Sequence, residues 1–289
     1  MGLIETLEKI KKQHIFVVML IVIALPLLFP SLFKQPIIVT NLTEAFYDQL
    51  QLLEPGDYVV ISAVVHVALF PETMAIIPIC KDLITRGIKI LVTNFGSYPE
   101  GPLLFTSFVE PELEAIGGVY GEDYVNFGVM GGQLGATMAS MTFAKDPRNL
   151  VHVDWYNNPL NELSILTPLF DEMDASGDAF ITLSQIKLCM DWGVGIGPVL
   201  TTWVIPYKKT AVSVTTTLAA MLFMPLFSAK LIKGLLYGTR GGAEIEILFG
   251  EVGTSNAYVS AMSLQHTAFF VFILIGNIIY FGKKRKGGQ

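Results

Sequence analysis

Apolar positions follow two different patterns along the chain. Residues 15–33 and 262–281 form apolar runs without Asp, Glu, Lys or Arg, and each is long enough to span a bilayer. Between them, short runs rich in Val and Ile alternate with segments of helical spacing, which is typical of a parallel sheet covered on both faces. We therefore predict an α/β protein in which a Rossmann-like, mostly parallel sheet domain (34–253) is flanked by two transmembrane helices.

The individual elements follow from these periods. Continuous apolar runs are typical of parallel strands that are buried on both faces. They predict strands at 58–67, 89–95, 123–130, 149–155 and 211–217, and another within 179–192. Helical spacing predicts helices at 71–87, 106–118, 131–144, 159–173, 195–206 and 220–238, a short amphipathic segment at 241–250, and a last helix that begins near Thr254 and includes the second apolar run.

The apolar run at 211–227 has two interpretations. It follows Lys208 and Lys209, and it is long enough to be weighed as a third membrane span. Three threonines at 215–217 and Pro225 interrupt it, so we interpret it as a buried strand that leads into a core helix.

Basic residues flank each long apolar run on the side that faces the nearer terminus of the chain. Three lysines precede the first run within residues 1–14, and the sequence KKRK at 283–286 follows the second. By the positive-inside rule, both termini are then cytoplasmic and the domain lies outside the cytoplasm. We predict a two-pass protein of the cell membrane, with spans at 15–33 and within 254–282 and a basic tail at 283–289. A cleaved signal peptide is the alternative for the first run, but no A-x-A site follows it.

Composition agrees with a chain that lies partly in lipid. Charged residues make up 15% of it, whereas soluble domains carry roughly 25%. The net charge of −6 argues against a nucleic-acid partner, which requires a basic face. Cys80 and Cys189 lie far apart in apolar stretches without zinc-ligand spacing, which predicts two buried free thiols.

A glycine-rich turn between a predicted strand and helix is one candidate binding element. Gly131 and Gly132 stand with Gly128 and Gly135 in the spacing GxxGGxxG, where free backbone N–H groups are able to bind an anion. The spacing is not GxGxxG, and tight packing of the helix on the sheet explains the glycines equally well.

Polar residues at the predicted carboxyl ends of the strands are a second candidate. Ligands of open α/β sheets bind at this edge, where the strand order reverses. A small polar ligand would meet there the side chains of His66, Asn94, Asn126, Asp154, Asp191 and Thr215. The chain contains no GxSxG, HExxH, Walker A or kinase signature, so we expect no cofactor and assign no catalytic residue.

Two weaker motifs concern ion binding and modification. Residues 174–185 resemble an EF-hand loop through Asp174, Ser176 and Asp178, but they lack the turn glycine and the final glutamate. A polar turn without calcium is therefore the favoured interpretation. Asn41 begins the triplet Asn-Leu-Thr, an N-glycosylation sequon just outside the first apolar run.

The last third of the chain resembles a family of prokaryotic membrane-anchored proteins. The resemblance rests on DWGVGIGPVLTTW at 191–203, TAVSVTTTLAAM, GLLYGTRGGAEIEILFG and SLQHTAFFVFILIGNIIYF. It implies a Rossmann-like domain closed by a C-terminal span, with the segment 240–244 in the place of an RGAAE-like motif. The resemblance carries no activity, so it implies no catalytic residues.

Three residues of this region are candidates for an interface. Arg240 is expected in the turn before a helix, because two glycines follow it, and Glu244 in the first turns of that helix. Arg240 either belongs to an ordinary capped helix or clamps a carboxylate elsewhere. Asn277 lies in the second apolar run and either bonds to the first helix or reaches toward the headgroups.

Two functions of different classes follow from these features. In the first, the chain is a structural or accessory subunit of a membrane assembly, with the bilayer and other membrane subunits or its own copies as partners. In the second, the domain binds or processes a small ligand at the strand ends. The missing motifs favour the first.

Overall fold

The computed structural model describes residues 10–97, 99–132, 135–176, 185–251 and 253–286. The chain divides into two compact units. One is the domain Ile38–Glu251, and the other is formed by the two ends of the chain, up to Ile37 and after Glu251.

The domain is built on a parallel sheet of six described strands in the order β3-β2-β1-β4-β5-β6. This order is that of the Rossmann fold, so the α/β prediction is confirmed. The strands are β1 (Tyr58–Val64), β2 (Lys89–Asn94), β3 (Tyr124–Val129), β4 (Ile186–Gly193), β5 (Thr210–Thr215) and β6 (Gly234–Tyr237).

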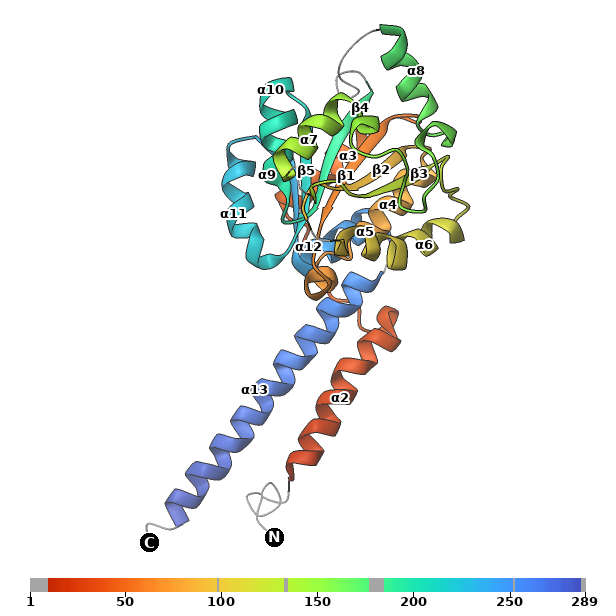
Figure 1. Cartoon of the computed structure of the whole chain (residues 1–289). Coiled ribbons are helices and arrows are strands. Elements are labelled where there is room, and N and C mark those ends of the chain that lie inside the picture. Colours follow the sequence, from red (N-terminus) through yellow and green to blue (C-terminus); the bar gives the residue numbers. More distant parts are fainter. Residues whose placement is uncertain (1–9, 98, 133–134, 177–184, 252, 287–289) are drawn as a thin grey trace. The chain divides into compact units, whose positions relative to one another are not determined.

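Helices cover both faces of this sheet, as Figure 1 shows. The first face carries α3 (Asn41–Gln51), α4 (Ile76–Thr85), α5 (Glu100–Leu104), α6 (Glu110–Ala115) and α12 (Gly238–Leu248). The second face carries α7 (Ala136–Lys145), α8 (Thr167–Ser176), α9 (Ile196–Val199), α10 (Ile205–Tyr207) and α11 (Thr217–Ser228).

Strand β1 shows why these segments read as continuous apolar runs. Successive side chains of a strand point to opposite faces of the sheet. Val59 and Ile61 are buried in the core of the first face, and Tyr58 and Val60 in the core of the second. Because both faces are covered, every position of the strand favours an apolar residue.

The terminal unit contains α2 (Lys12–Leu28) and α13 (Thr254–Lys286). The two helices lie side by side and run in opposite directions (Figure 1). Ser260 Oγ of α13 donates a hydrogen bond of 2.7 Å to the carbonyl oxygen of Phe33. Among the described residues, α13 is the one helix long and apolar enough to cross a membrane, with a mean hydropathy of 1.7 over its most apolar 18 residues.

Helix α2 differs from the predicted span at 15–33. It has 17 residues, about 26 Å at 1.5 Å per residue, and it ends at Leu28. Phe29 leaves the helical conformation because it precedes Pro30, which disfavours α geometry in the residue before it. One candidate span is therefore found where two were predicted.

Two other predictions of secondary structure are wrong. The segment 149–155 is not a strand: Val153 makes a single bridge to Pro159, and hydrogen bonds to the Asp154 side chain shape a turn there. The predicted helix 220–238 ends at Ser228, since Lys230 takes a left-handed φ of 60°, and β6 follows.

The glycines near Arg240 also behave differently from the expectation. Helix α12 begins at Gly238, so Arg240 lies inside its first turn and not before it. A Cβ on Gly241 would come within 3.3 Å of the backbone of Leu236 in β6. The glycines therefore let the start of α12 approach the sheet closely. The run at 211–227 does form a strand followed by a helix, as predicted.

Candidate functional site

The strand order reverses between β1 and β4, and this point defines the candidate site. In open α/β sheets, ligands bind in the crevice beyond the carboxyl ends of the strands at such a reversal. Here the two strands end at Val64 and Gly193.

Neighbouring segments of the chain pack very closely at this end of the sheet. A Cβ on Gly101 would overlap the carbonyl oxygen of Ala63, and a Cβ on Gly193 would overlap that of Val64. A Cβ on Gly195 would overlap the side chain of Val64. Glycine is needed at these positions because backbone and side chains from three segments meet without intervening space.

The loop after β1 adds bulk at the same end of the sheet. In dinucleotide-binding domains this first turn is glycine-rich, so that the pyrophosphate approaches the backbone. Here residues 65–72 contain no glycine, and Phe70 is buried. The Phe70 ring lies 6.1 Å from Trp192 and 4.7 Å from Phe108, measured between ring centroids. The position of the phosphate turn is therefore filled by aromatic packing.

Near the carboxyl ends of the strands, four buried polar residues form a row across the sheet. The strand register pairs Ser62 with both Thr93 and Asp191, and pairs Asp191 with Ser213. Residues paired in this way on parallel strands point to the same face. All four side chains are buried, so the row crosses β2, β1, β4 and β5 without reaching solvent.

Asp191 is the titratable member of this row. Ser213 Oγ donates to its Oδ2 at 2.9 Å, and the Gly195 N–H donates to its Oδ1 at 3.0 Å. Burial nevertheless raises the pKa of Asp191 to about 7, because removing a carboxylate from water costs more than these two bonds return. Ser62 Oγ and Thr93 Oγ1 have no hydrogen-bond partner within the described part of the chain.

Sequence inspection singled out Asp191 but missed the other three members of the row. A signal was present for Ser62 and Thr93, since each is the one Ser or Thr within the apolar run of its strand, whereas Ser213 shares β5 with two threonines.

The predicted residues at β2 and β3 do not join this row. Asn94 Oδ1 accepts the N–H of Gly96 at 2.6 Å, and Asn126 Oδ1 accepts that of Gly128 at 3.0 Å. Asp154 accepts hydrogen bonds from the Tyr120 hydroxyl and from the backbone and side chain of Asn158. Each of these side chains shapes the turn beside it.

His66 and Thr215 also hold neighbouring segments. The exposed His66 places Nδ1 3.0 Å from Glu100 Oε2, while buried Thr215 donates to the carbonyl oxygen of Gly193. In the glycine-rich turn, a Cβ on Gly131 would overlap the backbone of residues 95–96, whereas Gly132 is exposed with a φ of 32°. Close packing thus accounts for Gly131.

The candidate calcium and glycosylation residues lie on helices of the domain or outside the described residues. Asp174 lies in α8 and accepts bonds of 2.9 and 3.2 Å from the Arg148 guanidinium. Ser176 ends α8, and Asp178 lies outside the described residues. The described ranges contain no group of three or more His, Cys, Asp or Glu side chains able to hold a metal. Asn41 is exposed as the first residue of α3.

Glu244, and not Arg240, makes the clamp within the domain. Its buried Oε2 accepts bonds from the Thr40 N–H at 3.0 Å, the Thr40 hydroxyl at 2.7 Å and the Thr43 hydroxyl at 2.6 Å. Arg240, with 60% of its side chain exposed, donates from Nε to Oε1 at 3.0 Å. The carboxylate therefore ties the start of α3 to α12. Asn277 is exposed on α13.

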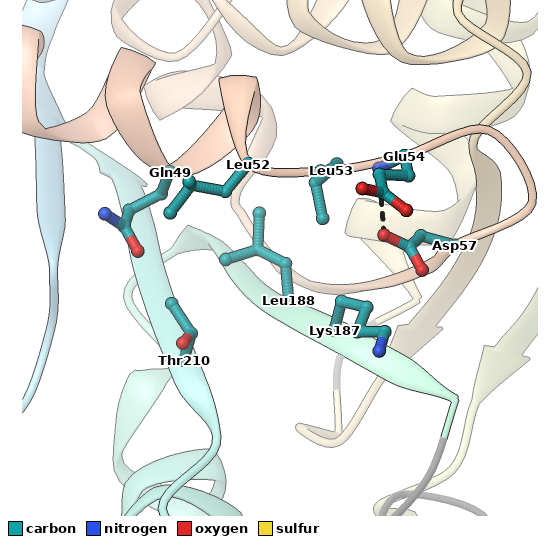
Figure 2. Close-up of a pocket in the computed structure, with 8 residues that line it drawn as sticks. All are labelled: Gln49, Leu52, Leu53, Glu54, Asp57, Lys187, Leu188 and Thr210. Atoms are coloured by element: carbon teal, nitrogen blue, oxygen red, sulfur yellow. Dashed lines mark hydrogen bonds between the residues drawn. The ribbon is translucent and has the colours of Figure 1, made fainter.

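A cavity of about 350 Å³ lies at the opposite, amino-terminal edge of the sheet, and Figure 2 shows its lining. Leu188 lies between the segment after α3 and the start of β5, and the Glu54 N–H donates to Asp57 Oδ2 at 2.9 Å. The other lining residues are Gln49, Leu52, Leu53, Lys187 and Thr210. None of the predicted site residues lines this cavity.

Comparison of the chain with protein-family models, with curated proteins and with solved structures finds no match.

We predict that Asp191→Asn removes a pH dependence of stability. Folded Asp191 keeps its proton up to about pH 7, whereas an unfolded Asp releases it near 4. The folded state therefore binds more protons between these values, and the free energy of unfolding falls by about 4 kcal/mol as pH rises through them. Thermal unfolding at a series of pH values should show this slope in the wild type and lose it in the variant. An unchanged slope would contradict the assignment.

We predict unequal effects of changes at Glu244 and Arg240. Glu244→Gln removes the buried charge that accepts three hydrogen bonds from Thr40 and Thr43, and should cost about 1–3 kcal/mol of unfolding free energy. Arg240→Lys changes one exposed contact and should stay within about 0.5 kcal/mol. Denaturant titration of the full chain in detergent measures both. Equal losses would show that Arg240 carries the clamp.

Proposed function

We propose that the chain is a membrane-anchored α/β domain that acts as a structural or accessory subunit of a membrane protein assembly. The observation that carries this proposal is the approach of Gly101, Gly193 and Gly195 to the end of β1. This close packing lies at the end of the sheet where Rossmann domains bind their ligands, and it leaves less room there for a ligand.

In this proposal α13 anchors the chain, and α2 is a second, shorter span. The 17 residues of α2 are at the lower limit for a membrane helix, and its neighbour α13 runs in the opposite direction. Basic residues precede α2 and follow the apolar part of α13, which favours two cytoplasmic termini and an extracytoplasmic domain.

Binding of a small ligand at the strand ends is the second candidate function. It is favoured by the buried carboxyl of Asp191 beside two hydroxyls that lack partners among the described residues, those of Ser62 and Thr93. Groups with perturbed pKa values cluster at functional sites. Thermal stabilisation of the wild type by a small polar ligand, lost in Asp191→Asn, would support this function over the accessory role.

Purification of the tagged full chain from its native membranes, in lipid nanodiscs, tests the accessory role. We expect one defined complex, containing another membrane protein or several copies of the chain, with the same mass ratio in repeated preparations. Native mass spectrometry measures this ratio. A single chain without any partner, across several mild extraction conditions, would contradict the proposal.

A further inference from the structure

Helix α11 exposes an apolar stripe on its outer side. Leu218, Met221 and Leu222 are 75%, 68% and 73% exposed, and Pro225 continues the same face one turn later. The opposite side of the helix buries Phe223 together with two alanines. Positions 218, 221, 222 and 225 have the i, i+3, i+4, i+7 spacing of one helix face, and we call them the outer stripe.

No described element of the domain lies over the outward side of α11 in Figure 1. The 12 residues of this helix include no charged side chain. A helix that is apolar on all sides is normally buried, so the outer stripe requires a cover.

Lysines gather at one end of this helix. Helix α11 returns along the sheet from the end of β5, and the Lys233 N–H donates to the Ala211 carbonyl at 2.7 Å. Exposed Lys208, Lys230 and Lys233 therefore lie near the carboxyl end of α11 and the start of β5. Residues 192–243 contain five basic residues and no acidic one, although the whole chain carries −6.

The other end of α11 has the opposite character. Glu72 Oε2 accepts the Thr217 N–H at 2.7 Å, which places a carboxylate at the start of the helix. A ligand that covers the outer stripe and carries negative charge would therefore meet opposite charge at the carboxyl end of α11, where the lysines lie.

The chain between α12 and α13 is short. Helix α12 ends at Leu248 and α13 begins at Thr254. Six residue steps span at most about 21 Å. If α13 enters a bilayer, as the proposed function has it, the domain stays close to the lipid surface.

We propose that α11 lies in the headgroup layer of an anionic bilayer, with the outer stripe against the acyl chains and the three lysines on lipid phosphates. This inference rests on the membrane anchoring in the proposed function. Apolar helix faces with adjacent lysines bind such surfaces through burial and charge together.

A second copy of the chain fits the stripe less well. A face of 12 residues measures roughly 18 Å by 10 Å, far below the ~800 Å² per partner of a stable interface. Insertion into lipid has no such minimum area. Lysines are also depleted in protein interfaces, whereas anionic lipids attract them.

Single-cysteine labelling of the full chain tests the proposal. Cys80 and Cys189 are buried, and burial raises the pKa of both thiols, so an added cysteine is labelled selectively. A fluorophore is attached at Leu222→Cys, or at the control Leu52→Cys, which is also 73% exposed but directly follows α3, a helix on the other face of the sheet. Phe270→Cys in α13 reports on the anchor.

The labelled chains are placed in nanodiscs of phosphatidylcholine, with and without phosphatidylglycerol, and quenched with spin-labelled lipids. We expect strong quenching at 222 with phosphatidylglycerol and little at 52. Reversing Lys230 or Lys233 to Glu should lower the inserted population at 222 by about fivefold or more each.

Three results would overturn the proposal. If the label at 270 is quenched, but the label at 222 is quenched no more than the label at 52, the lipid contact of α11 is rejected and the anchor remains supported. Cross-linking of two copies through position 222, without quenching, would assign the stripe to self-association. Absence of quenching at 270 would reject the anchor and, with it, the lipid contact.

Discussion

The domain depends on a close approach of backbones where its strand order reverses. Gly101, Gly193 and Gly195 bring two segments against the end of β1 at distances that no Cβ permits. The same segment after β4 donates its Val194 N–H to the Val64 carbonyl at 3.1 Å and its Gly195 N–H to Asp191. This close packing therefore fixes the end of β4 and orients the buried carboxyl.

This arrangement separates the fold from its usual function. The strand order is that of nucleotide-binding domains, yet the turn after β1 carries buried Phe70 instead of a glycine-rich phosphate loop. Fold and function are separable in general, because function depends on the site that a chain builds on the fold. Here the polar groups at the reversal are buried, and exposed apolar side chains gather on α2, α11 and α13.

Much of the sheet was predictable from local patterns. Strands β1, β2, β3 and β5 stand within one residue of their predicted starts, because runs buried on both faces leave a continuous apolar signal. Strand β6 was missed, since its four residues carry too little pattern and α12 begins directly after them at Gly238. The segment 149–155 alternates like a strand, but the Asp154 side chain captures backbone N–H groups and forms a turn.

The candidate site was predictable only in part. The rule that ligands bind at strand ends pointed to Asp191, but its hydrogen bond to Ser213 depends on the strand register. Likewise, Glu244 is buried because Thr40 and Thr43 reach it from about 200 positions earlier in the chain. Such non-local partners leave no periodic trace in a sequence.

The most direct test of the close packing at the end of β1 is the stability of Gly101→Ala compared with that of Gly197→Ala in the full chain. Both glycines lie in helices, where alanine is intrinsically favoured by about 0.5–1 kcal/mol. A Cβ at 101 would overlap Ala63, whereas nothing lies within 4 Å of one at 197. We expect Gly101→Ala to lose about 1–3 kcal/mol of unfolding free energy and Gly197→Ala to lose none. Equal or greater stability of Gly101→Ala would show that α5 does not pack closely on the end of β1 and would contradict the account.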